Sequence, residues 1–345
     1  MEHSKLLRLL LFLTICMCIF NNPISAQNYP DPKVNSMIWS GIGSLLQQDY
    51  DSSFETFRTL TSRYPGLPLG YIYMSAVRIA EAADYEEPFD EQFIESNLEK
   101  SEQLSRKLIN QDKNNAWNYY YLAISKGYLA YFKALKESYV SAFSEGLSSI
   151  SSFEKCLAID SSFYDAYIAL GAYKYWKSEK TEYLHWLPFV SDERDYGIKL
   201  LNHAVRHKTY NHYLALNSLL WIYVNKKQPS RAVSIARRGL KDYPGSRFFR
   251  WGLARALQDI DKRKAISEYY VLLQSVNSLP RNNHYNQIVI MHKIAQLYRD
   301  LGQRDEALDL CNQIIQTKNL KPYVVKKLKD RMDRVYKLRK ELSGR

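Results

Sequence analysis

The sequence predicts an all-α protein built as an α-solenoid, that is, a stack of antiparallel helix pairs. Apolar residues recur at three- and four-residue spacing in one segment after another, and the alternation typical of β-strands is sustained nowhere. The 28 Tyr outnumber the 13 Gly and the 11 Pro, a composition that favours long helices with few tight turns. A chain of 345 residues can bury a large core as two domains or as one extended array.

The clearest helix pair spans residues 288–321. Apolar residues recur at helical spacing in both of its halves: Met291, Ile294, Tyr298, Leu308, Cys311 and Ile314. Gly302 lies between the halves, where glycine can adopt the left-handed conformation that ends a helix. Asp305 and Glu306 then favour the start of the second helix, because acids stabilise its positive end. The small residues Ala295 and Ala307 are expected where the two helices cross most closely.

This unit resembles the tetratricopeptide repeat, a helix-turn-helix of about 34 residues that stacks into a right-handed superhelix. Residues 213–321 resemble three consecutive repeats, because Leu-Gly, Ala-Leu and a terminal Pro recur together. Within residues 27–110, the stretch 37–65 resembles another repeat, and a looser helical hairpin follows it. Residues 116–204 resemble longer repeats with an aromatic insert at 177–193. The chain departs from the family in one respect, because it lacks Trp at the position in the first helix where the repeat typically has one.

Other pairs show small residues at their expected crossings. Gly41 and Ser53 take these positions in the stretch 37–65, and Phe57 is the bulky neighbour. In the unit that begins near Tyr167, Gly171 belongs to the Leu-Gly signature, and Gly197 and Ala204 take the small positions of the second helix. The sequence therefore predicts close helix contacts at these positions, although it leaves open whether residues 66–110 continue the superhelix.

The first 26 residues have the layout of a signal peptide. Lys5 and Arg8 precede an apolar run from Leu9 to Phe20, and Ala26 offers a small residue at a cleavage site. The run is shorter than the roughly 20 residues that span a membrane, although an uncleaved anchor is the alternative. Cys16 and Cys18 lack the small preceding residue of a lipoprotein signal. We expect export to a bacterial envelope, with the protein periplasmic, outer-envelope associated or secreted, and with no transmembrane span after cleavage.

The family resemblance implies a binding surface on the concave face, which the first helix of each pair lines. Aromatic and Arg side chains contribute most at interfaces. The register of the repeats gives ten candidate partner-binding residues: Trp117, Tyr120, Tyr175, Trp176, Asn217, Trp221, Trp251, Arg255, His292 and Arg299. The alternative is that several of them pack between neighbouring helices.

Two functions follow from this face. The first is a non-enzymatic scaffold whose groove binds a peptide or protein segment. The second is a small-ligand or glycan-binding protein, in which the insert around Trp186 closes over Tyr175 and Trp176 to form an aromatic pocket. The insert could also cap a local core.

The sequence offers no frame for catalysis, a cofactor or a metal. His203 and His207 are one helical turn apart, but no third ligand is placed nearby, and a solvated face is the expected setting. Cys156 and Cys311 fall at packing positions of separate units, so we expect buried free thiols. Neither a Ser-His-Asp order nor a Gly-rich phosphate loop occurs.

Residues 322–345 predict a basic capping helix. The stretch 321–345 holds ten Lys or Arg and three Asp or Glu, so it contributes +7 to the net charge of +12. A solenoid needs a cap because its last apolar face would otherwise meet water. The Lys and Arg of this helix are either solvated or face an anionic surface, and export makes nucleic acid an unsuitable partner.

Overall fold

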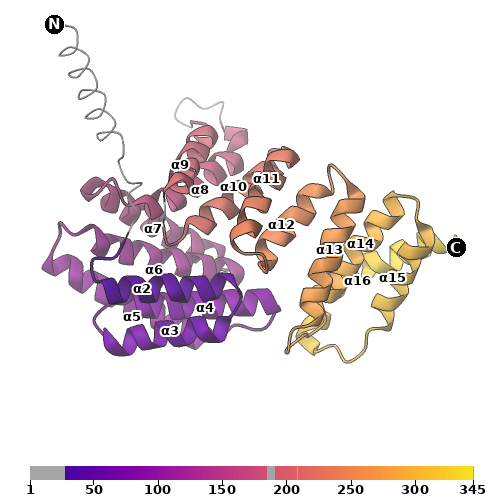
Figure 1. The fold of residues 1–345 in the computed structure, drawn as a ribbon, viewed down its shortest axis with the longest axis horizontal. Coiled ribbons are helices and arrows are strands. Elements are labelled where there is room, and N and C mark those ends of the chain that lie inside the picture. The colour runs from indigo at the N-terminus through magenta and orange to yellow at the C-terminus, as the bar shows by residue number, and fades with distance from the viewer. Residues whose placement is uncertain (1–27, 185–190, 208, 345) are drawn as a thin grey trace, which may run out of the picture.

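The computed structural model describes residues 28–184, 191–207 and 209–344, and Figure 1 shows them as an array of helices. These residues hold fifteen α-helices, one 3₁₀ turn and no strand, which confirms the predicted all-α class. The N-terminal helices are α2 (Pro32–Leu46), α3 (Tyr50–Arg63), α4 (Pro68–Tyr85), α5 (Glu91–Gln111), α6 (Ala116–Leu135), α7 (Tyr139–Ile159) and α8 (Tyr164–Lys180). After the turn η1 (Glu182–Leu184) come α9 (Arg194–Arg206), α10 (His212–Asn225), α11 (Pro229–Asp242), α12 (Arg247–Leu257), α13 (Lys262–Asn277), α14 (Tyr285–Asp300), α15 (Arg304–Gln316) and α16 (Pro322–Ser343).

Each helix packs against the next along the chain, and first helices also contact one another. The contacts between first helices join α4 to α6, α8 to α10, α10 to α12, and α14 to α16. The first helices therefore form one layer of the stack and the second helices form the other, which is the arrangement of an α-solenoid. Helices α4 and α5, from the stretch whose place the sequence left open, pack between α3 and α6 and continue the stack.

Helix ends follow the local sequence. Asp31 begins α2 and accepts hydrogen bonds from the backbone N–H groups of Lys33 and Val34, at 2.8 and 3.2 Å. Gly302 follows the end of α14 with a φ of +77°, the left-handed conformation predicted for it. Pro229 and Pro322 occupy the first turns of α11 and α16, where a missing N–H leaves no bond unmade.

The small residues lie at close helix crossings, as the sequence predicts. The Ser53 hydroxyl donates to the carbonyl of Gly41 over 2.8 Å. A Cβ added to Gly197 would lie 2.5 Å from the carbonyl oxygen of Gly171, so the backbones of α8 and α9 pass at a distance that only glycine allows. Ala295 and Ala307 are both fully buried between α14 and α15.

Two large hydrophobic clusters form the core. One runs through α8 to α16 and the other through α2 to α10, so the middle of the chain contributes to both. Cys156 and Cys311 are buried free thiols in separate clusters, which confirms the sequence prediction. The predicted signal peptide lies outside the described residues. None of the helices in the described part of the chain combines the length and the apolar character needed to cross a membrane.

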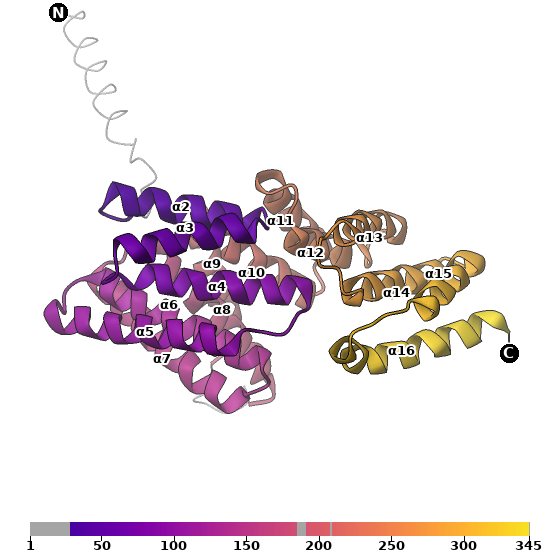
Figure 2. The ribbon, with the colours of Figure 1, turned by 90° about the horizontal axis from the view of Figure 1, so that it is seen from below.

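The N-terminal pairs fold back on the C-terminal half. Figure 2 shows the C-terminal end of α4 near α14 and α16, although these helices are far apart in sequence. Asp84 at this end forms an ion pair with Arg247 of α12, and Glu86 pairs with Lys327 of α16 over 2.9 Å. The end of α4 therefore contacts both α12 and α16.

Candidate functional site on the inner face of the C-terminal helices

Three of the ten predicted binding residues are buried. Tyr120 is 1% exposed, Tyr175 is 0% exposed and His292 is 1% exposed, so the prediction that they face an open groove is wrong for this structure. Register places a residue on the face of a helix, but it does not show whether another segment covers that face. The other seven keep some exposure: Trp117, Trp176, Asn217, Trp221, Trp251, Arg255 and Arg299.

Tyr120 belongs to a buried polar network. Its hydroxyl donates to the Asp165 carboxylate over 2.9 Å, and the Asn211 side-chain amide donates to the same oxygen over 2.9 Å. Burial raises the pKa of Asp165, although hydrogen bonds, those from Asn211 and Tyr120 among them, oppose this shift by favouring its charged form. The network joins α6, α8 and the linker before α10, so Tyr120 has a structural role.

The chain's own N-terminal segment covers Trp117. The ring of Tyr29 meets the Trp117 ring edge-on at 4.9 Å, and the Tyr29 N–H donates to the Tyr210 hydroxyl over 2.6 Å. A hollow of about 410 Å³ remains beside them, with Tyr64, Leu108 and Tyr121 in its lining. The inner face of the N-terminal half is thus largely occupied from within the chain.

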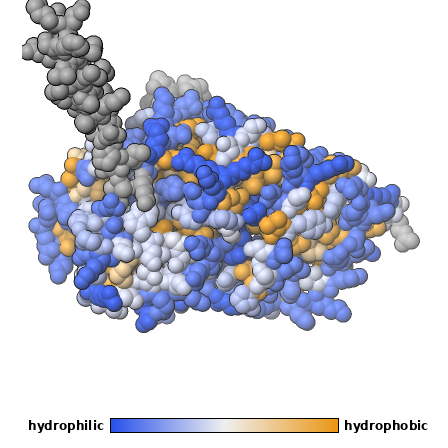
Figure 3. Space-filling view, in the orientation of Figure 1, coloured by the Kyte–Doolittle hydropathy of each residue, from blue (hydrophilic) through white to orange (hydrophobic). Residues whose placement is uncertain are grey.

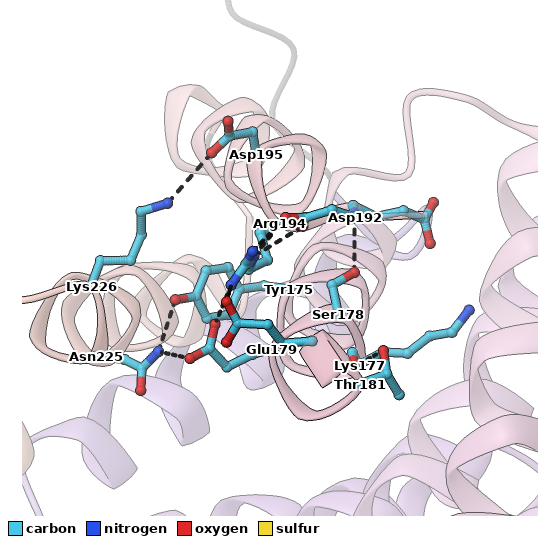
Figure 4. A network of polar contacts seen from close by, with 12 residues as sticks. Tyr175, Lys177, Ser178, Glu179, Thr181, Asp192, Arg194, Asp195, Asn225 and Lys226 are labelled. Atoms are coloured by element: carbon cyan, nitrogen blue, oxygen red, sulfur yellow. Dashed lines mark hydrogen bonds and ion pairs between the residues drawn. The ribbon is translucent and has the colours of Figure 1, made fainter. Parts of the chain in front are cut away.

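Tyr175 takes part in the polar contacts that Figure 4 shows. The Asn225 amide donates to the Tyr175 hydroxyl over 3.0 Å and to the Glu179 carboxylate over 2.8 Å. Arg194 joins Glu179 to Asp192 across the start of α9. Trp176 is partly exposed and meets Tyr175 edge-on at 5.1 Å. Trp186, the third residue of the predicted aromatic pocket, lies outside the described residues, so the pocket stays a prediction.

The inner face of the C-terminal half is open. Trp221 on α10 is 38% exposed, an unusual value for a tryptophan in a helical stack. Trp251 on α12 is partly exposed and packs edge-on against Tyr269 at 5.7 Å. Arg255 follows one turn later and forms an ion pair with Asp259 over 2.9 Å. Figure 3 shows apolar areas among hydrophilic ones on one side of the molecule, over the central and C-terminal helices.

The acidic end of α4 docks against this half of the molecule. Asp84 accepts hydrogen bonds from Arg247 Nε at 2.9 Å, from the Tyr50 hydroxyl at 2.8 Å and from the Gln48 amide at 3.1 Å. The side-chain amide of Asn286 on α14 donates to the Asp84 carbonyl over 2.7 Å. Asp84 thus links the loop after α2 and the start of α3 to α12 and α14.

Neighbouring acids extend this contact. Glu81 forms an ion pair with Arg281, which also lies 3.7 Å from Glu87. Glu86 pairs with Lys327 of α16 over 2.9 Å. The Asn283 amide donates to the Tyr85 carbonyl over 2.8 Å. The C-terminal helices therefore hold an acidic segment of the same chain, residues 81–87.

Three cations beside this contact have no acidic partner. No carboxylate among the described residues lies within 4 Å of the charged nitrogens of Lys293, Arg331 or Arg334. Burial lowers the pKa of Lys293 and of Arg331, and the repulsion between the cations lowers both further. Arg331 Nη1 lies 3.4 Å from Nδ1 of buried His292. Burial and the surrounding cations lower the pKa of His292 to about 4, so the imidazole is neutral near pH 7.

A second exposed apolar surface lies on the α6–α7 hairpin. Val140 is 88% exposed, Tyr139 is 68% exposed and Phe143 is 65% exposed. A hollow of about 270 Å³ lies beside them, lined by both helices and by Tyr173. This surface competes with the inner face as a contact site, because exposed apolar patches mark interaction sites.

His203 and His207 pack against aromatic rings. The His207 ring stacks on Tyr164 at 3.6 Å, and His203 meets Tyr167 edge-on at 4.9 Å. The prediction of a purely solvated setting is therefore wrong. The described residues contain no group of three or more His, Cys, Asp or Glu side chains arranged to hold a metal ion.

Sequence reasoning missed the contribution of Asp84, Arg247, Lys293, Arg331 and Arg334. The acidic linker after α4 and the basic charge of the last helix were both visible in the sequence. Neither signal indicates that the two meet, because residues so far apart share no periodicity. Residues 322–345 indicate a single basic capping helix, so the sequence presents Arg331 and Arg334 only as part of its charge.

Comparison with known proteins supports the repeat assignment. Residues 290–317 match the model of the tetratricopeptide repeat. A search of curated proteins finds no match to this chain. Among solved structures, the chain is similar to YrrB, described as a TPR protein with an unusual peptide-binding site, with a TM-score of 0.43 and 18% identity over 61% of this chain and 90% of YrrB.

Two other similar structures belong to the same class of helical fold. One is the C-terminal part of a TPR repeat-containing protein from Cytophaga hutchinsonii, with a TM-score of 0.42 and 18% identity over 84% of this chain and 99% of that one. The other is yeast Tom70, with a TM-score of 0.45 and 12% identity over 94% of this chain and 67% of Tom70. The match to the tetratricopeptide repeat model thus falls on residues 290–317, within an all-α fold of stacked helix pairs.

Proposed function

We propose that the protein is a non-enzymatic interaction scaffold that holds a segment of a partner protein along the inner face of its C-terminal helices. The observation that carries this proposal is the exposure of Trp221 on α10 together with the partial exposure of Trp251 on α12, two successive first helices. Large aromatic side chains lose little conformational entropy on binding and bury a large area. The N-terminal half of the inner face is covered by the chain itself and offers less room.

The test is affinity capture of partners with the wild type and with a Trp221→Ala, Trp251→Ala double variant. The matched control is Tyr139→Ala, Phe143→Ala, which removes two exposed aromatic side chains from the α6–α7 hairpin. We expect the tryptophan variant to lose partners that the control retains. If both variants keep the same partners, the inner face is not the contact surface. If only the control loses them, the hairpin is the contact surface.

The proposal includes export to a bacterial envelope, supported by the charged start, apolar run and small residue of the first 26 residues. The mature chain then begins at Gln27, two residues before the Tyr29 that packs on Trp117. Mass spectrometry of the N-terminal peptide from the native source checks this. A chain that begins at Met1 contradicts cleavage.

A further inference from the structure

The cation cluster consists of Lys293 and Arg331, which are partly buried, and the exposed Arg334; its two partly buried members are an exception among the described residues. Other partly buried cations have acidic partners: Arg250 pairs with Glu268 over 2.7 Å, and Lys126 pairs with Glu102 and Glu145 over 2.6 and 2.9 Å. A charge that is partly removed from water without a partner lowers stability. Groups held in such a state are candidates for ligand contact.

The cluster continues a surface that already binds acids. Lys327, Arg331 and Arg334 recur at four- and three-residue spacing, so they share one face of α16. Glu86 of the same chain pairs with the first of them over 2.9 Å. The next two have no acid, and Lys293 of α14 adds a third cation beside them.

We propose that this cluster binds the side-chain carboxylates of an acidic segment in a partner protein, which continues along α16 from the point where Glu86 ends. The proposal rests on the proposed function, because it names the chemistry of the segment that the same inner face holds. The contact of residues 81–87 shows the type of ligand that this face accepts: Glu and Asp side chains at the end of a helix, held by Arg247 of α12, Arg281 of the α13–α14 linker and Lys327 of α16.

His292 supports the same assignment. Its Nδ1 faces the Arg331 guanidinium, which can only donate, so the proton of the neutral imidazole is on Nε2. Nε2 has no hydrogen-bond partner although it is buried. The α14–α16 contact therefore holds three cations and a neutral imidazole with no acid within 4 Å of the cations, an arrangement that favours an anion beside Arg331.

The test uses fluorescence anisotropy with an acetylated, C-terminally amidated peptide of alternating Glu and Ala, so that side chains supply all of its negative charge. The variant is Arg331→Gln, Arg334→Gln. The matched control is Lys329→Gln, Lys340→Gln, which removes the same charge from the opposite, exposed face of α16. We expect the cluster variant to bind at least about tenfold more weakly and the control to stay within roughly twofold of wild type. A peptide of alternating Gln and Ala should not bind.

Several results would overturn the proposal. One is failure of the wild type to bind the Glu peptide. Another is an equal loss of affinity in both variants, which would indicate attraction to the overall positive charge of α16 rather than a site. Displacement of the peptide by inorganic phosphate at a lower concentration than by free glutamate would indicate a phosphate site instead.

Two controls distinguish failure of this proposal from failure of the proposed scaffold function. Removal of mutually repelling cations should leave the urea midpoint unchanged or raised, so the cluster variant is expected to fold. If the wild type does not bind the Glu peptide while partner capture still depends on Trp221 and Trp251, the acidic segment is refuted and the scaffold function stands. Glu-peptide binding without any effect of the Trp variant on partner capture refutes the scaffold function alone.

Discussion

The Arg247 guanidinium and the Asp84 carboxylate form an ion pair that is buried on both sides. Arg247 Nε lies 2.9 Å from Asp84 Oδ1, and the two side chains are 8% and 7% exposed. The residues lie on α12 and at the end of α4, so this contact fixes how the N-terminal pairs fold back on the C-terminal half. Because Tyr50 also donates to Asp84, the carboxylate has partners on both sides of the junction.

Breaking this pair should strongly destabilise the protein. Replacement Arg247→Met leaves the Asp84 charge buried with neutral partners, and we expect a loss of about 3 kcal/mol in the free energy of unfolding. The double variant Asp84→Asn, Arg247→Met should lose less than the sum of the single variants, as urea unfolding can measure. The control Lys327→Met removes a more exposed pair with Glu86 and should lose less than about 1 kcal/mol. Equal losses would contradict a dominant role for the buried pair.

The crossing of α8 and α9 should tolerate no side chain at Gly197. A Cβ there would lie 2.5 Å from the Gly171 carbonyl oxygen and 2.9 Å from the Tyr175 nitrogen. We expect Gly197→Ala to lower the free energy of unfolding by about 2 kcal/mol or more, because backbone atoms must shift. Gly43→Ala in α2 meets nothing within 4 Å and should raise stability by roughly 0.5 kcal/mol. Urea unfolding of both variants distinguishes a tight crossing from general intolerance of substitution.

The buried Asp165 should make stability fall as pH rises. Its pKa is raised in the folded state by burial, so the unfolded chain releases the proton first as pH increases. The stability that this group contributes is therefore full below the unfolded pKa and is lost as pH rises through the folded pKa. Asp165→Asn should be less stable than wild type at low pH, because the network loses a carboxyl acceptor. The difference should narrow toward neutral pH, and a constant difference would contradict the raised pKa.

The buried His292 should make stability fall as pH decreases, which is opposite to the effect of Asp165. Its folded pKa of about 4 lies below the unfolded value of 6.5, so the unfolded chain takes up the proton first as pH falls. Stability is lost between pH 6.5 and 4, by up to about 3 kcal/mol. His292→Gln should remove this loss, whereas His207→Gln, at a partly exposed ring just after the end of α9, serves as the matched control. Unfolding curves at several pH values would contradict the assignment if the two variants kept the same acid dependence.

The sequence predicts the helix pairs well because local signals define them. The recurrence of Met291, Ile294 and Tyr298, the turn at Gly302 and the small residues at crossings depend only on residues within one pair. These signals locate α14 and α15 and the stretches of the other pairs. They also place Trp221 and Trp251 on first helices.

The rest could not be predicted because it depends on contacts between distant segments. Tyr29 lies across Trp117, and Asp84 meets Arg247, but no periodic pattern links these residues. Tyr120 and Tyr175 have the register of groove residues, yet each donates or accepts a hydrogen bond inside the core. A helical register gives the face of a residue, whereas burial depends on what covers that face.

The central claim is that the inner face of the C-terminal helices holds the partner. Site-specific photo-crosslinking tests it most directly, with benzoylphenylalanine placed at Trp221 or Trp251, and separately at Tyr139, Phe143 or Tyr270 on second helices. The account predicts partner adducts at the two tryptophan positions and none at the other three. Adducts confined to the α7 or α13 positions would contradict it.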